Sequence, residues 1–173
     1  MSCYNTLLGL LNEGDIFVET GTGKGRGVKH ALTKNVKEVH SVEIDVNRYN
    51  LCVKRLKQYK NVYLYNGDSI KMLPHILDNH IRSKTVFLLD AHVMDLKETS
   101  GAQICPVLEE LKLILDNGKV NNVKHIIVID DVKLFDGSRI YFGNIKLDTI
   151  KQLILSYDAA YEIKVDRRAL SAI

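Results

Sequence analysis

Carboxylate side chains end or directly follow most of the short apolar runs in this sequence. These acids are Glu19, Glu43, Asp68, Asp90, Asp130 and Asp131. If the apolar runs are parallel strands of one sheet, their carboxyl ends meet at the edge where open α/β sheets bind ligands. Carboxylates that gather there repel one another unless a ligand or a cation compensates their charge. We therefore expect a binding site for a charged ligand at this edge.

A run of alternating glycines follows the first of these acids. The glycines are Gly21, Gly23, Gly25 and Gly27. Glycine accepts a positive φ and lets a ligand approach bare backbone. A helix that starts after such a turn points its free N–H groups at the ligand. A strand, a glycine turn and a helix in this order predict a nucleotide pocket.

The spacing of these glycines excludes two common nucleotide fingerprints. Counting G-x-G-x-x-G from Gly21 places Arg26 at the third glycine. Counting from Gly23 places Val28 there. No register supplies the phosphate-loop pattern G-x-x-x-x-G-K-[ST]. The pocket is therefore predicted to bind neither a dinucleotide nor a nucleoside triphosphate in the usual way.

The pattern that remains is an acid, one residue and then G-x-G-x-G. It consists of Glu19, Gly21, Gly23 and Gly25. This resembles motif I of the class I S-adenosylmethionine-dependent methyltransferases. The resemblance implies that the loop, together with Thr20, wraps the methionine end of the cofactor, and that Glu19 helps to hold its amino group directly or through water. An ordinary glycine-rich turn between a strand and a helix is the alternative.

The acids after the second and third runs extend this resemblance. Glu43 matches the family position at which a carboxylate accepts from the ribose hydroxyls, with Asp45 as the backup. Asp68 matches the position that faces the adenine amino group. We expect Ser69 to be mainly a helix N-cap, at the border of the cofactor site. In the alternative, Asp68 lies only in the turn that precedes the helix.

The aspartates after the fourth and fifth runs are similar to a metal site of the catechol and caffeoyl-coenzyme A O-methyltransferases. Those enzymes place Asp after the fourth strand and Asp-Asn after the fifth. The resemblance implies that Asp90, Asp130 and Asp131 bind Mg²⁺ or Ca²⁺ and take part in catalysis, because a metal lowers the pKa of a substrate hydroxyl. Asp131 replaces the family's Asn. In the alternative, Asp90 orders the cofactor loop and the Asp130-Asp131 pair caps a turn.

His92 is the second candidate for chemistry, since it lies two residues beyond the fourth run. Histidine titrates near neutral pH and can take a proton from a hydroxyl. A packing role in the loop is the alternative. The other histidines are expected to be structural or exposed: His30, His40, His75, His80 and His125.

Two irregular segments follow the fourth and fifth runs and are candidates to shape the acceptor site. The polar segment 93–103 is predicted to be a lid. The segment 133–146 carries Arg139, Tyr141 and Phe142, which are candidates to line the site.

Strand and helix patterns alternate along the chain and predict the elements that position these residues. The predicted strands are 16–19, 38–43, 61–65, 85–90 and 125–130, followed by a hairpin at 161–173. The predicted helices are 4–12, 28–32, 45–57, 69–77, 104–115 and 148–156. Such alternation predicts a three-layer α/β sandwich with a doubly wound, mostly parallel seven-stranded sheet that ends in an antiparallel hairpin. This architecture resembles the Rossmann-like methyltransferase fold.

Length and composition predict a compact cytoplasmic protein with a single domain, 1–173. The cysteines, Cys3, Cys52 and Cys105, lack metal spacing and indicate a reducing compartment. We recognise no signal peptide and no apolar run of membrane-spanning length. The formal net charge of +3 does not argue for nucleic acid, and the basic residues near the glycines are expected to be solvated surface.

These observations predict an S-adenosylmethionine-dependent methyltransferase that acts on a hydroxyl oxygen of a small molecule or a sugar, with a divalent metal as an assisting ion. Nucleic acid is disfavoured, because Asp90-Ala91-His92-Val93 lacks the N/D-P-P-Y/F/W motif of base amino-methylation. The stretches F-L-L-D-A-H, C-P-V-L-E-E-L and I-I-V-I-D-D-V resemble methyltransferase-like proteins of bacteria, phages and large DNA viruses. A non-catalytic, cofactor-binding or regulatory subunit is the alternative from another class. In either reading, we expect substrate recognition to come from the two loops, from a homo-oligomer or from a partner subunit.

Overall fold

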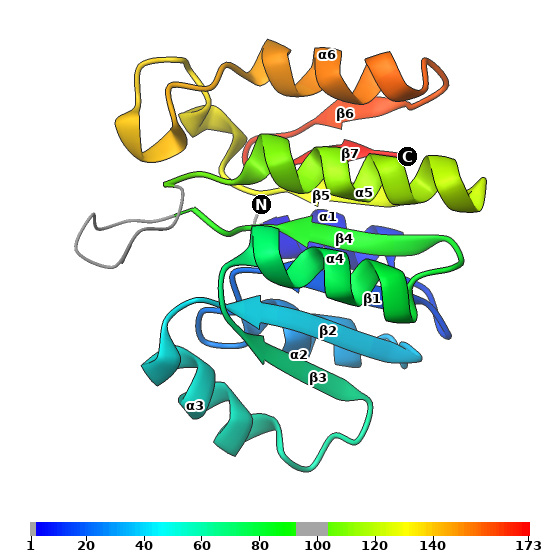
Figure 1. Cartoon of the computed structure of the whole chain (residues 1–173), viewed down its shortest axis with the longest axis vertical. Helices are drawn as coiled ribbons and strands as arrows, with labels where there is room; N and C mark the ends of the chain where they lie inside the picture. Colours follow the sequence, from blue (N-terminus) through cyan, green and yellow to red (C-terminus); the bar gives the residue numbers. More distant parts are fainter. Residues whose placement is uncertain (1–2, 93–103) are drawn as a thin grey trace.

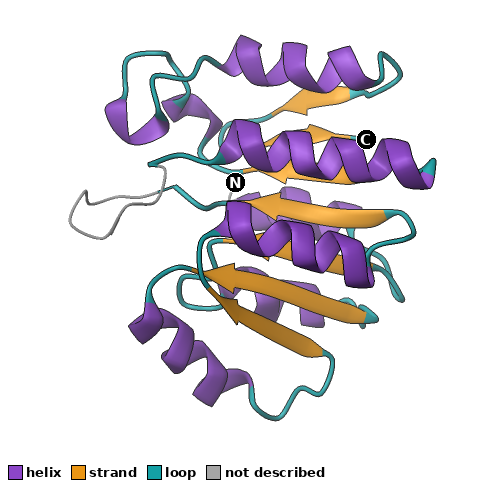
Figure 2. Ribbon diagram, viewed as in Figure 1, coloured by secondary structure: helices purple, strands orange, loops and turns teal. Residues whose placement is uncertain are grey.

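The computed structural model describes residues 3–92 and 104–173, in which strands and helices alternate (Figure 1, Figure 2). The strands are β1 Ile16–Thr20, β2 Glu38–Glu43, β3 Val62–Asn66, β4 Thr85–Leu89, β5 Ile126–Ile129, β6 Ile163–Val165 and β7 Leu170–Ala172. The helices are α1 Cys3–Leu10, α2 Arg26–Leu32, α3 Val46–Leu56, α4 Ser69–His80, α5 Val107–Asn121 and α6 Leu147–Tyr157. Two 3-10 turns, η2 Val132–Leu134 and η3 Ile140–Phe142, separate β5 from α6.

The seven strands form one sheet in the order β3-β2-β1-β4-β5-β7-β6. The first five are parallel, and β7 runs antiparallel to both β5 and β6. The chain winds outward from β1 to β3 and then returns to β4 on the other side of β1, so the strand order switches between β1 and β4. Open sheets of this kind bind ligands at the switch point. The predicted doubly wound sheet and its terminal hairpin are confirmed.

Helices cover both faces of the sheet, as a buried parallel sheet requires. Successive side chains of a strand point to opposite faces. Accordingly, Ile16 and Val18 of β1 pack in the core beneath α4, α5 and α6, whereas Phe17 packs in the core beneath α1, α2 and α3. Figure 1 shows α4 and α5 in front of the sheet and α1 and α2 behind it. The predicted three-layer architecture is confirmed.

The predicted helix boundaries differ from the structure in physically informative ways. The predicted helix 104–115 begins at Val107 and continues to Asn121, and Pro106 is its N-cap rather than part of its first turn. The predicted helix 69–77 continues to His80 and tolerates Pro74 in its interior. The helix predicted over 45–57 is confirmed, but its Val46 is 51% exposed because the buried side is formed by Cys52 and Leu56.

Among the described residues, no helix combines the length and the apolar character needed to cross a bilayer.

Candidate functional site

The carboxyl ends of the four central strands are tied together by backbone hydrogen bonds. The N–H of Gly21 donates to the carbonyl of Val42 at 2.9 Å, which joins the end of β1 to β2. The N–H of Asp90 donates to the carbonyl of Thr20 at 3.0 Å, and that of Asp130 donates to Leu89 at 3.1 Å. The predicted acids of β1, β2, β4 and β5 are therefore brought to one edge, on the left of Figure 1.

The glycines of the loop serve two different purposes. Gly21 has a φ of +83°, and a Cβ there would overlap the backbone carbonyl of Asp90. A Cβ on Gly27 would overlap the carboxylate of Glu19. Gly23 has a φ of +54°, but a Cβ on it would meet no atom within 4 Å. Thus Gly21 and Gly27 are required by internal packing, whereas Gly23 borders open space that a ligand can occupy.

Glu43 fastens this loop to the turn after β2. Its Oε2 accepts the N–H of Gly23 at 2.7 Å and its Oε1 accepts the N–H of Asp45 at 2.9 Å. The residue is only 4% exposed. A carboxylate has about four acceptor positions, so Glu43 keeps capacity for the ribose hydroxyls of the predicted cofactor. Asp45, the predicted backup, instead caps α3 by accepting the N–H of Arg48.

Glu19 lies beneath the loop rather than on its open side. Its Oε2 accepts from the hydroxyl of Ser41 at 2.8 Å, and the Ser41 hydroxyl is 2.6 Å from that of Thr22. Burial raises the pKa of Glu19 well above its usual range, against the hydrogen bond from Ser41, and the charges of Asp90 and Glu43 raise it further. The carboxyl group therefore supports the loop from below. Its predicted contact with the cofactor's amino group stays a prediction.

The boundary between β3 and α4 corrects one prediction. Asp68 is the N-cap of α4, and its Oδ1 accepts the N–H of Ile70 at 3.1 Å. Ser69, predicted as the cap, is the first helical residue and is buried. Both residue types cap helices well, but Asp68 holds the extended backbone that the cap position needs, with φ −69° and ψ 129°. The predicted adenine contact of Asp68 and the cofactor contact of Ser69 stay predictions.

His92 lies between two of the predicted aspartates. Its Nδ1 is 3.5 Å from Oδ1 of Asp90, and its Nε2 is 3.4 Å from Oδ2 of Asp131. Burial lowers the pKa of His92, but the hydrogen bond to Asp131 and the charges of Asp90, Asp131 and Asp130 outweigh it and raise the pKa above its usual range. Burial raises the pKa of Asp90 to about 7, against the charge of His92. The carboxyl group of Asp90 therefore titrates near neutral pH, and the surroundings of His92 favour its protonated form.

The predicted divalent-metal site does not fit this arrangement. The imidazole of His92 fills the space between the carboxylates of Asp90 and Asp131. Oδ1 of Asp130 accepts the N–H of Asp131 at 2.7 Å, and Asp131 has a left-handed backbone with a φ of 52°. In the described part of the chain, these three aspartates do not form a group whose ligand atoms lie within 4.8 Å of one another. We therefore derive no step through a metal.

A small cavity beside His92 is closed by the segment after β5. The Phe142 ring packs on the His92 ring with centroids 4.7 Å apart, and Phe135 lines the cavity. Of the three candidates in this segment, Phe142 therefore reaches the site. Arg139 pairs with Asp136 at 3.1 Å on the surface, and Tyr141 is 39% exposed. The predicted lid, 93–103, lies outside the described residues.

Glu110 is a site residue that the sequence patterns did not single out. It is 1% exposed on α5 and lines the cavity beside His92. The Ser69 hydroxyl bonds its carboxyl group, and burial raises its pKa to about 7. Its Oε1 and the hydroxyl of Thr20 are both buried, and the interaction with Thr20, like that with Ser69, opposes the rise in this pKa. The signal was present, because Glu110 is three residues after Val107 on the apolar face of the predicted helix.

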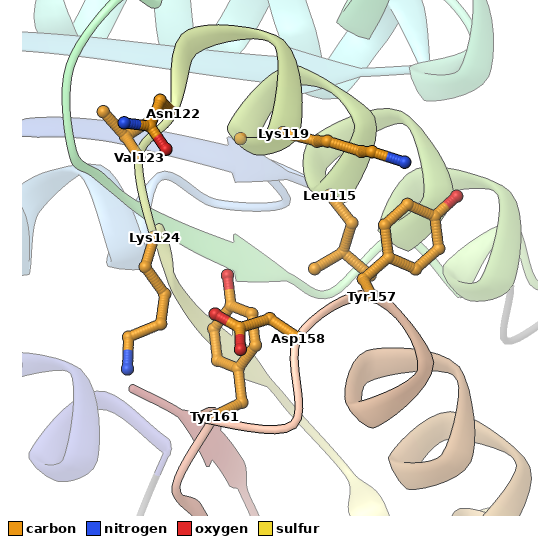
Figure 3. A pocket seen from close by; sticks show the side chains of 9 residues that line it. Leu115, Lys119, Asn122, Val123, Lys124, Tyr157, Asp158 and Tyr161 are labelled. Carbon is orange, nitrogen blue, oxygen red and sulfur yellow. The ribbon is translucent and has the colours of Figure 1, made fainter.

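A separate hollow lies at the opposite edge of the sheet, between the ends of α5 and α6 (Figure 3). It has a volume of about 350 Å³. Nζ of Lys124 lies 5.5 Å from the ring centre of Tyr161 and donates to the carbonyl of Ala160 at 3.1 Å. The lysine is therefore already engaged within the protein, and the hollow contains none of the predicted site residues.

Comparisons with known proteins agree with this architecture. No family model matches the chain. It is 40% identical over 62 residues to ribosomal RNA small subunit methyltransferase A of Caldanaerobacter subterraneus subsp. tengcongensis, a match that covers 36% of this chain and 23% of that protein. The protein of the same name from Persephonella marina is 32% identical over 95 residues, which cover 46% of this chain and 36% of that protein. The chain thus matches only about a quarter to a third of these curated relatives.

Solved structures match over almost the whole chain. An O-methyltransferase from Bacillus cereus, in complex with S-adenosylhomocysteine, superposes with a TM-score of 0.68 at 10% identity and covers 98% of this chain and 78% of its own. The precorrin-6y C5,15-methyltransferase of Geobacter metallireducens superposes with a TM-score of 0.66 at 13% identity, covering 98% and 86%. Identities this low establish the fold alone. The chain has the class I, Rossmann-like methyltransferase fold.

Proposed function

We propose that this chain is an S-adenosylmethionine-dependent methyltransferase in which His92 takes the proton from the methyl acceptor. The observation that carries the proposal is the negative charge gathered at the carboxyl ends of the central strands. Glu19, Glu43, Asp90 and Asp131 meet there; His92 pairs with Asp90 and Asp131, and the charge of Arg168 also acts on Asp131. A cofactor that carries a sulfonium and an ammonium group compensates this negative charge.

The glycine loop and the acids fit this cofactor. Open space at Gly23 provides room for the cofactor beside the loop. Glu43 and Asp68 remain the residues that hold the ribose and the adenine in this proposal. When bound, S-adenosylmethionine supplies an electrophilic methyl group.

The residues at the ends of β4 and β5 provide the proton transfer from the methyl acceptor. Asp131 accepts from Nε2 of His92 and so leaves Nδ1 without a proton in the neutral ring. Nδ1 then takes the proton of an acceptor hydroxyl, and the negative charge of Asp90 stabilises the imidazolium that forms. Phe142 packs on the ring and restricts its orientation. Asp131 is a positioning residue in this mechanism, and His92 is the general base.

The acceptor that we place first is a hydroxyl group of a small molecule or a sugar. A second candidate, ribosomal RNA, is favoured by the names of the two curated relatives. Exposed basic residues around the glycine loop and on α3 and the turn after it are also suited to phosphate contacts: Lys24, Arg26, Lys29, Lys54, Arg55, Lys57 and Lys60. The absence of an N/D-P-P-Y/F/W motif after β4 counts against amino-methylation of a base.

The two acceptors are distinguished by one transfer assay. The protein is incubated with methyl-labelled S-adenosylmethionine and either a panel of phenols, catechols and sugars or isolated small-subunit ribosomal RNA. We expect label in a hydroxyl acceptor. Label only in the RNA would make ribosomal RNA the acceptor and would leave the proposed methyl transfer unchanged. Binding of the cofactor without transfer to either class would favour the non-catalytic, regulatory alternative.

A further inference from the structure

Three side chains with metal-ligating atoms meet far from the glycine loop, at the amino-terminal end of β2. They are Glu38, His40 and His80. Glu38 and His40 are two residues apart on β2 and therefore share one face of the sheet. His80 is the last residue of α4, which packs on that face. One ligand atom from each side chain lies within 4.8 Å of the other two.

The hydrogen bonds around His40 leave a position for a cation. Its Nδ1 lies 2.9 Å from the hydroxyl of Tyr65, and its Nε2 lies 3.3 Å from Oε2 of Glu38. In one tautomer, Nε2–H donates to Glu38 and Nδ1 accepts from Tyr65. In the other, Nδ1 donates to Tyr65, and Nε2 carries a lone pair that faces the carboxylate, so that a cation takes the place of the proton between these two acceptors.

We propose that Glu38, His40 and His80 form a site for one divalent transition-metal ion of the Zn²⁺ type. Imidazole nitrogen and carboxylate oxygen are ligands that Zn²⁺ prefers. Bonds of about 2.0 to 2.1 Å in a tetrahedral site put ligand atoms about 3.4 Å apart. The 3.3 Å between His40 and Glu38 already matches this spacing, and the atoms of His80 need to approach by less than about 1.5 Å.

The surroundings match those of metal-bound histidines. A ligating histidine usually bonds its second nitrogen to a neighbouring group that fixes the ring, and Tyr65 provides this bond. The Tyr63 ring stacks on the His40 ring, with ring centres 5.0 Å apart. His40 is fully buried, whereas the side chain of Glu38 is 24% exposed, so an ion can enter from solvent past Glu38. Three protein ligands leave the fourth position to water.

The bound ion would cross-link the end of α4 to β2, at the edge of the sheet opposite the glycine loop. The inference does not depend on the proposed methyl transfer. It also revises the prediction that His40 and His80 are only structural or exposed. The sequence contains no metal-spacing motif here, because the two histidines are forty residues apart and meet only after folding.

The test is a titration of the metal-free full chain with Zn²⁺ in competition with a coloured chelator, with thermal unfolding followed in parallel. We expect one Zn²⁺ per chain at this site and a higher melting temperature. His80→Gln removes that ion and its stabilisation. His75→Gln, on the exposed side of the same helix, keeps both. Tyr65→Phe retains the ion with an affinity lower by about 10- to 100-fold.

Two further variants locate the ion within the molecule. Glu38→Gln removes the same ion, and circular dichroism of each metal-free variant checks that the fold is retained. His92→Gln leaves this ion in place. The proposal is overturned if the wild type binds no Zn²⁺, if His80→Gln binds as the wild type does, or if His92→Gln instead removes the ion and so places it at the carboxyl ends of the central strands.

Discussion

Glu43 and His92 lie at the same edge of the sheet, but they are held by different kinds of contact. The Glu43 carboxylate accepts two backbone N–H groups, at 2.7 and 2.9 Å. The His92 imidazole touches two carboxylates at the longer distances of 3.5 and 3.4 Å. The β1–β2 side is therefore fixed by backbone, whereas the β4–β5 side is held by contacts between titratable side chains, in which the pKa values of Asp90 and His92 are both raised.

This difference predicts a division of labour. Changes on the β1–β2 side should alter the affinity for S-adenosylmethionine and leave the pH profile intact. Changes on the β4–β5 side should alter the rate and its pH dependence and leave cofactor affinity intact. Effects that cross this division would break the comparison.

The largest effect is expected from Gly23→Val. The valine side chain fills the open space at a φ of +54°, so binding of S-adenosylmethionine should fall below detection in calorimetry. Gly14→Val is a matched control, because Gly14 also has a positive φ, +82°, and open space, but lies before β1 at the opposite edge. Gly14→Val should carry similar backbone strain and still bind. Equal loss in both variants would mean that strain, not occlusion, is measured.

His92→Gln should have the next largest effect. Loss of a general base lowers kcat by about 10²- to 10⁴-fold, while the dissociation constant for S-adenosylmethionine stays at the wild-type value. Steady-state transfer rates and calorimetry measure the two quantities. His75→Gln replaces an exposed histidine on α4 and should leave both unchanged. Wild-type turnover in His92→Gln would remove this residue from the mechanism.

Glu43→Gln should weaken cofactor binding about 10-fold, because an NH₂ group then faces one of the two backbone N–H groups and leaves it unsatisfied, at a cost of about 1 to 3 kcal/mol. The rate at saturating cofactor should change little. Glu13→Gln, an exposed substitution in the turn before β1, is the control for a lost surface charge. A drop in kcat without a change in affinity would place Glu43 on the catalytic side.

Asp131→Asn should give the smallest change and the most specific one. The base is active when neutral, so activity rises with pH through the pKa of His92, which Asp131, Asp90 and Asp130 hold above its usual range. Without the Asp131 charge that pKa falls, and the midpoint of the rate profile should shift to lower pH by about one unit. Asp136→Asn, in the surface pair with Arg139, should leave the midpoint unchanged. A shift to higher pH would contradict the assignment of His92 as the base.

The fold was largely predictable because buried parallel strands are continuous apolar runs. β2 has the predicted limits, 38–43, and β1 and β4 differ by one residue at their carboxyl ends. The acids at the strand ends were predictable for the same reason, since they follow those runs. On α3, the apolar spacing found the helix, but Val46 and Val53 of that apolar pattern are exposed, because the direction of a helix face depends on its tertiary neighbours.

The contacts within the site were not predictable to the same extent. The metal hypothesis required open space between Asp90 and Asp131, and the sequence does not reveal that a left-handed backbone at Asp131 brings its carboxylate to His92. Glu110 interrupts an apolar helix face and was therefore detectable in principle. The meeting of His40 with His80 depends on how α4 crosses β2, which no local pattern encodes.

The central claim, that the open side of the glycine loop is an S-adenosylmethionine site, is tested most directly by titrating the wild-type chain with S-adenosylhomocysteine in a calorimeter. We predict saturable binding of one molecule per chain, retained in His92→Gln and lost in Gly23→Val. An absence of binding by the wild type to both S-adenosylhomocysteine and S-adenosylmethionine would contradict the claim, and with it the proposed reaction.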